Sequence, residues 1–203
     1  MDLQPQAFYQ RLQEDDRHPT TSQAGVGDFL DAIQQAMDRG ATETLILTVS
    51  SAMSGAYNMA SQAAAQAEIP VTVIDSKGPS MSLGWQVLAA ARARDEGAGM
   101  EEIIECVNQV RESLVQVVAM ETLEYLETGG RIGEAAKWVG TVLKVKPVVM
   151  IDHKKGWLHR PAWREPKNQL WRLCLRNLKM RLVREKYFIL QFCMVTPWKK
   201  RKN

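Results

Sequence analysis

Residues 44–74, TLILTVSSAMSGAYNMASQAAAQAEIPVTVI, decide the fold that the sequence predicts. Residues 44–49 and residues 70–74 are apolar and rich in β-branched side chains, so each run predicts a short buried strand. Residues 57–67 between them are rich in Ala and Gln and predict a helix. Because the links are short and a helix joins the strands, we expect the two strands to lie parallel in one sheet.

The same alternation continues on both sides of this unit. Apolar residues at helical spacing predict further helices at residues 2–16, 28–37, 83–94, 100–114, 122–127 and 131–143. Short apolar runs predict further strands at residues 115–120 and 146–152. The pattern predicts an α/β protein, with a parallel sheet flanked by helices and the start of a second, smaller α/β domain. We expect the first domain in residues 1–114, the start of the second in 115–156, and a separate tail in 157–203.

The composition excludes several classes of protein. No stretch of the 203 residues approaches the roughly 20 apolar residues that cross a bilayer, and the N-terminus is acidic and polar, so we expect a cytoplasmic protein without a transmembrane segment. The three cysteines and three histidines are scattered, which indicates neither a disulfide framework nor a metal site. We expect no cofactor.

The charge divides the chain sharply at about residue 157. Residues 1–156 carry a net charge of −8, whereas residues 157–203 carry +11 and four of the six tryptophans. A basic segment with interleaved aromatic and aliphatic residues, loosely helical over residues 170–189, is one alternative functional element, because it could bind nucleic acid or a membrane surface. The leading interpretation includes no nucleic-acid partner.

Two hydroxyl-bearing turns are the candidate ligand site. Ser54 and Gly55 follow the first strand and precede a helix, where free backbone N–H groups and the helix dipole favour an anion. Thr21 and Ser22 precede the helix at 28–37. Ligands of parallel sheets bind beyond the carboxyl ends of the strands, so both turns could hold one anion. Each turn can equally be a simple helix cap, with Asp28 at the start of the second helix.

A hydrolase or acyl transferase using Ser54 is a further alternative. The sequence around this serine lacks the G-x-S-x-G pattern of a nucleophile elbow, and no histidine is placed to act as its base. Neither a P-loop nor a dinucleotide-binding glycine pattern is present. The Gly129–Gly130–Arg131 step is interpreted as a helix break. We therefore expect no catalytic residues.

Five motifs occur in the order and spacing of one known family. They are TTSQ (20–23), SSAMSGAY (50–57), VIDSKGPSMSLGW (73–85), ETLEYLETGGRI (121–132) and KVKPVVMID (144–152). In this combination the sequence closely resembles the DegV family over roughly residues 3–156. The resemblance implies a two-domain α/β protein that encloses one long-chain fatty acid and, in several members, presents its carboxylate to a fatty acid kinase. It implies a binding protein rather than an enzyme.

The resemblance assigns the ligand site residue by residue. Thr21 and Ser22 match the family's T-S-Q run, and Ser54 and Gly55 match its S-G-T step; in the family these groups surround the ligand carboxylate. Ala56 stands where the family usually has a threonine, so one hydroxyl of the head-group site is missing. The family's two opening strands, which would precede Met1, are also expected to be absent.

The resemblance stops after Gly156, and a change of reading frame explains why. Consider the reading frame in which each new codon consists of the last base of one codon and the first two bases of the following codon. In that frame, the codons for residues 163–175 permit A-R-T-K-K-S-A-M-E-A-M-F. Those for residues 188–202 permit H-I-A-V-L-H-G-D-A-L-E-E-A-E-K. Both runs resemble the family in the correct order, so we expect residues 157–203 to be a non-native tail that packs poorly. The tail lacks the arginine and histidine that the family places on the second side of the ligand, which implies weakened binding.

Sequencing the gene tests this interpretation of the tail. We expect the codons for residues 163–175 and 188–202 to spell those two runs in the shifted frame, since both follow from one frame change near residues 155–157. The frame change would be contradicted if these codons, translated in the shifted frame, gave residues unrelated to the two runs. The tail would then be a genuine basic segment of the protein.

Overall fold

The computed structural model describes residues 4–15, 19–120, 122–134, 148–159 and 190–195. The helices are α1 (Pro5–Glu14), α2 (Val26–Asp38), α3 (Ala56–Ala64), α4 (Met81–Asp95), α5 (Met100–Ser113) and α6 (Glu124–Thr128). The strands are β1 (Thr44–Thr48), β2 (Val71–Asp75), β3 (Leu114–Ala119), β4 (Val148–Asp152), β5 (Trp157–His159) and β6 (Leu190–Val195). The elements expected within the described residues are present, most with ends shifted by one to three residues. The expected helix at 131–143 lies largely outside these residues.

The first sheet consists of β1 and β2, which pair in parallel as the sequence predicts. The register runs from Thr44 opposite Val71 to Thr48 opposite Asp75, so both strands end at the same edge. The mixed α/β fold class is therefore confirmed. The parallel pair is possible because α3 carries the chain from the end of β1 back to the start of β2.

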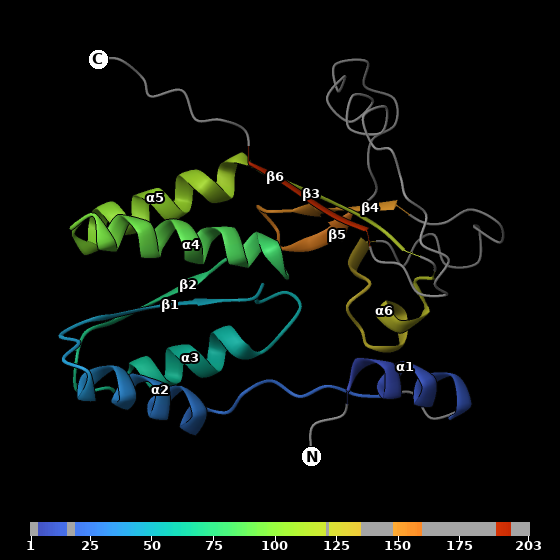
Figure 1. Ribbon diagram of the computed structural model, residues 1–203, viewed down its shortest axis with the longest axis horizontal. Helices are drawn as coiled ribbons and strands as arrows, with labels where there is room; N and C mark the ends of the chain where they lie inside the picture. The colour runs from blue at the N-terminus through green and yellow to red at the C-terminus, as the bar shows by residue number, and fades with distance from the viewer. Residues whose placement is uncertain (1–3, 16–18, 121, 135–147, 160–189, 196–203) are drawn as a thin grey trace.

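Helices cover both faces of this sheet (Figure 1). Helix α3 packs on the strands with α2 outside it, and α4 and α5 pack together on the other face. The core on the α4–α5 side is apolar and small, and its buried residues Ala90, Ile103 and Val107 meet the partly buried Leu45, Leu47 and Ile74. Helix α2 ends before Gly40, whose φ of +90° suits a residue without a side chain, as the sequence predicts.

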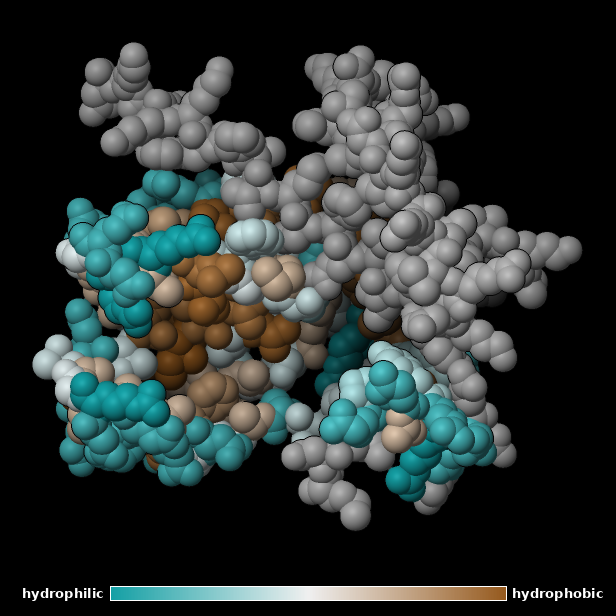
Figure 2. All heavy atoms as spheres, in the orientation of Figure 1, coloured by the Kyte–Doolittle hydropathy of each residue, from teal (hydrophilic) through white to brown (hydrophobic). Residues whose placement is uncertain are grey.

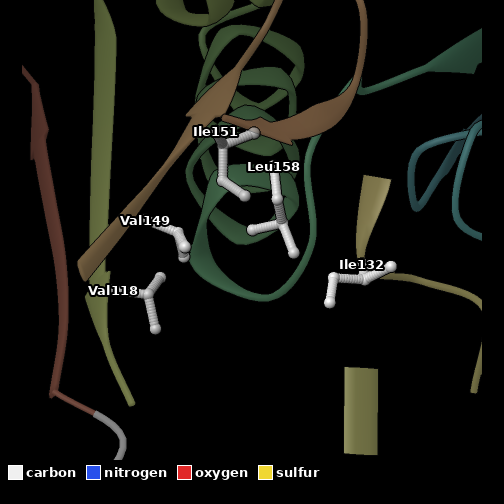
Figure 3. Close-up of a cluster of buried hydrophobic side chains, with 5 residues drawn as sticks. All are labelled: Val118, Ile132, Val149, Ile151 and Leu158. Atoms are coloured by element: carbon white, nitrogen blue, oxygen red, sulfur yellow. The ribbon is translucent and has the colours of Figure 1, made fainter. Parts of the chain in front are cut away.

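The second sheet is antiparallel, in the order β5–β4–β3–β6. Strand β3 begins at Leu114, directly after the last residue of α5, so no linker separates the two units. Figure 3 shows the buried cluster of this unit, in which side chains from β3, β4, β5 and the segment after α6 converge: Val118, Val149, Ile151, Leu158 and Ile132.

Two strands of the second sheet lie beyond residue 156, in the segment that the sequence analysis assigned to the tail. Strand β5 lies past Gly156 and pairs with β4, and its Leu158 is only 3% exposed. Strand β6, from the expected tail, pairs with the whole length of β3. The segment 170–189, with its loosely helical pattern, lies outside the described residues.

One face of the first unit is apolar and open to solvent. Met81, Val87 and Leu88 of α4 are each about 40% exposed. Figure 2 shows this hydrophobic area over α4 and the strands, above the hydrophilic surface of α2. Within the described residues the first sheet has two strands and therefore two unpaired edges. An apolar face beside open strand edges favours association with other chains.

The substitution Leu158→Ala tests whether β5 belongs to the folded second unit. Removing a buried leucine side chain costs roughly 2–5 kcal/mol, through lost apolar contacts and the cavity left behind. We expect the free energy of unfolding in urea to fall by about that amount. Leu88→Ala is the matched control, because this leucine is 41% exposed, and it should change stability by less than about 1 kcal/mol. Equal, small effects of both substitutions would show that β5 is not packed.

Candidate functional site

The loops that follow β1 and β2 form the candidate site. Because the strands are parallel, both loops lie at one edge of the sheet, and backbone hydrogen bonds join them. The N–H of Ser50 donates to the carbonyl of Gly78 at 3.3 Å, and the N–H of Ser76 donates to that of Thr48 at 3.1 Å. Helices α2 and α3 both begin at this edge, on the side that faces the second unit (Figure 1).

Ser54 and Gly55 lie in the β1–α3 loop at the N-terminus of α3. The Ser54 N–H donates to the carbonyl of Ser50 at 3.1 Å, and the Ser54 Oγ accepts the N–H of Ala56 at 3.2 Å. The N-cap of α3 is Gly55, which has no side-chain cap hydrogen bond, so Ser54 satisfies the first N–H of the helix from the position before the cap. Among the described residues its hydroxyl hydrogen has no acceptor, so it remains able to donate to a ligand.

Thr21 and Ser22 precede α2 and are exposed. Among the described residues their side chains make no hydrogen bond with one another or with the β1–α3 loop. The next residue brings the two turns together: a Cβ on Gly55 would lie 3.2 Å from both Cδ and Nε2 of Gln23. Contact between the turns therefore runs through Gln23, which lies in the TTSQ motif but was not among the predicted site residues.

Asp28 stabilises the beginning of α2. Its Oδ2 accepts the backbone N–H of Gly25 at 2.7 Å. This carboxylate satisfies the N–H that precedes the helix from the third helical position, so α2 begins at Val26 and not at Asp28, where the sequence predicted its start.

An ion pair strengthens the end of β2. Lys77 Nζ lies 2.7 Å from Oδ2 of Asp75, and the hydroxyl of Ser51 donates to the same oxygen. The Lys77 backbone N–H donates to the other oxygen at 2.8 Å. Partial burial alone would raise the pKa of Asp75, but the hydrogen bonds from Lys77 and Ser51 outweigh it and lower the pKa below its ordinary value of 3.8.

Arg131 reaches the site from the second unit. Its Nε donates to the carbonyl of Met53 at 3.0 Å, and its Nη1 donates to that of Gly129. Met53 directly precedes Ser54, and its side chain packs against the buried cluster of the second sheet. The sequence analysis interpreted the glycine-arginine step as a helix break and missed this contact, because only the tertiary structure brings residue 131 to residue 53.

A serine and a histidine do meet, but they are not the residues that the hydrolase alternative requires. His153 Nε2 lies 2.8 Å from Oγ of Ser82, whose hydroxyl donates to Oε1 of Gln116. Ser82 is 0% exposed, so a substrate cannot reach its oxygen. No described histidine is hydrogen-bonded to Ser54, and this geometry gives no support to Ser54 as a nucleophile.

Two features are absent from the residues that the structure describes. In that part of the chain, no group of three or more His, Cys, Asp or Glu side chains is arranged to hold a metal ion. None of the helices described is both long enough and apolar enough to cross a bilayer.

Comparison with known proteins identifies the family. The model of the DegV family, a family of uncharacterised proteins, matches residues 1–160. The chain belongs to the DegV family. A DegV domain-containing protein of Deinococcus radiodurans is 42% identical over 151 residues, which are 74% of this chain and 52% of the relative. One from Staphylococcus aureus is 34% identical over 152 residues, which are 75% of this chain and 54% of the relative.

Solved DegV structures have the same fold. A DegV family protein from Thermus thermophilus, which binds fatty acid, superposes with a TM-score of 0.74 at 31% identity, over 79% of this chain and 56% of its own. A DegV lipid-binding protein from Thermotoga maritima gives a TM-score of 0.67 at 29% identity, over 76% and 53%. The resemblance found in the sequence is confirmed. The chain spans about half the length of the curated relatives it matches.

Acid unfolding tests the ion pair at the end of β2. A carboxylate whose pKa is lowered by folding adds stability above about pH 4, and this stability is lost as the pH falls through the lower folded-state pKa. We expect Asp75→Asn to remove this contribution, so that its urea midpoint falls less steeply than that of the wild type below about pH 4. Asp95→Asn is the control, because the Asp95 side chain is 65% exposed, and it should keep the wild-type slope. An unchanged slope in Asp75→Asn would contradict the assignment.

Proposed function

We propose that this DegV protein binds one long-chain fatty acid, with the carboxylate held by Thr21, Ser22, Ser54 and Gly55. The single observation that carries the proposal is the contact between Gln23 and Gly55, which brings two hydroxyl-bearing turns to one edge of the sheet. The fatty acid binding of the Thermus thermophilus relative supports the ligand class.

The edge of the sheet has the chemistry that a carboxylate requires. Helices α2 and α3 begin there, so backbone N–H groups and the positive ends of two helix dipoles lie beside the hydroxyls. Hydrogen-bond donors are essential, because a carboxylate that loses water without gaining them is strongly destabilised. The Ser54 hydroxyl can donate to the ligand while its oxygen still accepts from the backbone of α3.

Apolar side chains lie next to this polar end. Met53, one residue before Ser54, packs against the buried cluster of the second sheet. The same cluster is bordered by three other partly buried residues, Met120, Leu123 and Leu126. Each methylene of an acyl chain buried among such residues contributes about 0.8 kcal/mol, so this neighbourhood favours an aliphatic tail. Flexible Met and Leu side chains can also adapt to tails of different shape.

We further propose that the protein carries its ligand rather than transforming it, and presents the carboxylate to a fatty acid kinase. Thr21 and Ser22 are exposed, so a carboxylate bound beside them would be accessible to a second protein. The alternative, a hydrolase or acyl transferase using Ser54, predicts a covalent adduct on this serine. The carrier proposal predicts that the ligand leaves unchanged when the protein is denatured.

Mass spectrometry of the purified protein separates these functions, and a pair of serine variants locates the site. We expect a co-purifying fatty acid without a covalent adduct. Ser54→Ala should weaken fatty acid binding about tenfold or more, because a hydrogen bond to a charged group contributes roughly 1.5–3 kcal/mol. Ser61→Ala is the matched control on the same helix, since its hydroxyl donates to the carbonyl of Tyr57 and not to the site. It should bind as the wild type does.

Three outcomes would contradict the proposal. They are the absence of fatty acid binding by the folded protein, a mass increase localised to Ser54, and equal affinity of both serine variants. The first rejects the ligand class and the second favours the enzyme. The third leaves the ligand class standing and moves the carboxylate to another place in the molecule.

A further inference from the structure

The turn between β4 and β5 connects the second unit to the loops of the candidate site. This turn, residues 153–156, places two residues against the first unit. Gly156 contacts the beginning of the β1–α3 loop, and His153 contacts the loop that leads from β2 into α4. It thus touches both loops that follow the parallel strands.

The contact at Gly156 leaves no space for a side chain. The hydroxyl of Ser50, itself 0% exposed, donates to the carbonyl of Gly156 at 2.9 Å. A Cβ at Gly156 would lie 2.2 Å from Ser50 Oγ, so there is no room for a side chain. The φ of +77° also favours glycine, because other residues rarely adopt this backbone conformation. Ser50 also accepts, through its carbonyl, the backbone N–H groups of Met53 and Ser54. The position of the turn therefore bears directly on the Ser54 loop.

The contact at His153 is equally close and involves an imidazole. A Cβ on Gly78 would lie 3.3 Å from Cδ2 of His153, and the ring Nε2 lies 2.8 Å from Ser82 Oγ. The Ser82 hydroxyl proton is directed to Gln116, so the Nε2–H of the ring donates to the Ser82 oxygen. A second proton must then be carried by Nδ1, which adds a positive charge to a partly buried ring between the two units.

We propose that His153 is a positioning residue for the Ser54 loop. As a neutral ring packed against Gly78 and Ser82, it keeps the β4–β5 turn where Gly156 accepts the Ser50 hydrogen bond, and its protonation loosens the loop. The effect on the loop stands without a ligand. The accompanying loss of affinity for a fatty acid rests on the function proposed above.

The charged groups around the ring favour its neutral form. Burial lowers the pKa of His153 below its ordinary value of 6.5, and the charges of Arg111 on α5 and His159 on β5 lower it further, against an opposing effect of Asp152. Helix α4 and strand β3 face the ring with the uncharged Ser82 and Gln116. Two other nearby side chains, Lys77 and Asp75, are paired with each other.

The direction of the pH effect follows from linkage. In a loosened state the ring is hydrated and has a higher pKa than in the closed state, so the loosened state binds more protons. The closed arrangement is therefore fully stabilised above about pH 6.5, and this stabilisation is lost as the pH falls toward the lowered pKa of the closed state. Loosening is expected on acidification within a window in which only His and few other groups titrate.

Amide hydrogen exchange on three forms of the full chain tests the proposal. The forms are wild type, His153→Gln, whose amide nitrogen can still donate to Ser82 but does not titrate, and the control His159→Gln. Protection of the Met53 and Ser54 amides is measured at about pH 7.5 and about pH 5.5, relative to the exchange rate of an unfolded peptide, and fatty acid affinity is measured alongside. A role confined to structural support predicts no difference in pH profile between the forms.

We expect protection and affinity of the wild type to fall by about threefold or more on acidification. His153→Gln should stay within about twofold across the two pH values in protection. Any pH dependence of affinity that persists in this variant belongs to the ligand carboxylate. His159→Gln should retain the wild-type fall, displaced to slightly higher pH because one charge that opposes His153 protonation is gone.

Two results would overturn the proposal, namely a protection profile of His153→Gln that matches the wild type and a wild-type profile that does not depend on pH. Gly78→Ala provides a further check, because its Cβ would lie 2.4 Å from Ser82 Cβ and would push the His153 ring away from its contacts at every pH. Protection of the Met53 and Ser54 amides should therefore be low in this variant at both pH values. If no form binds fatty acid but the protection data follow the expected pattern, the function proposed above fails and the positioning role of His153 stands.

Discussion

The parallel pairing of β1 with β2 is the constraint on which the rest of the structure depends. Parallel strands end at the same edge, so the register that places Thr48 opposite Asp75 also places two loops side by side. The N-termini of α2 and α3 come to that edge for the same reason. Ser54 and Gly55 lie at this edge, Gln23 brings the turn of Thr21 and Ser22 against Gly55, and the second unit contacts the same edge.

The second unit is attached at this edge largely through hydrogen bonds. Ser50 binds Gly156, Ser82 binds His153, and Arg131 binds the carbonyl of Met53. A polar junction of this kind resembles the interfaces between domains that move relative to each other, because hydrogen bonds can be exchanged with water at modest cost. Apolar packing contributes through Met53, which joins the buried cluster of the second sheet. A binding site at such a junction can be rigid when closed and still admit a ligand.

Ser54 shows how one side chain can serve both the fold and a ligand. Its oxygen accepts the Ala56 N–H and thereby stabilises the start of α3. The hydroxyl hydrogen points elsewhere and is the part that a carboxylate would use. The same hydroxyl can therefore stabilise the start of α3 through its oxygen and donate its hydrogen to a ligand. Gln23 lies close to Gly55, next to this serine.

The sequence by itself determined the elements and their class. Alternating apolar runs and helical spacing are local signals, so β1, α3 and β2 could be recognised, and the order of short motifs was enough to identify the family. The sequence analysis ended the second unit at Gly156, where the composition changes, and the three-residue strand β5 beyond this point is held by pairing with β4. Three residues give no periodic signal of their own.

Only the tertiary structure decided which polar groups meet. Gln23 against Gly55, Arg131 at Met53 and His153 between Gly78 and Ser82 join positions far apart along the chain, and none has a local sequence signature. A hydrogen bond between distant residues depends on how sheets and helices pack, which a periodic pattern does not record. The hydroxyl turns could thus be identified as candidates from the sequence, but their convergence is a property of the fold.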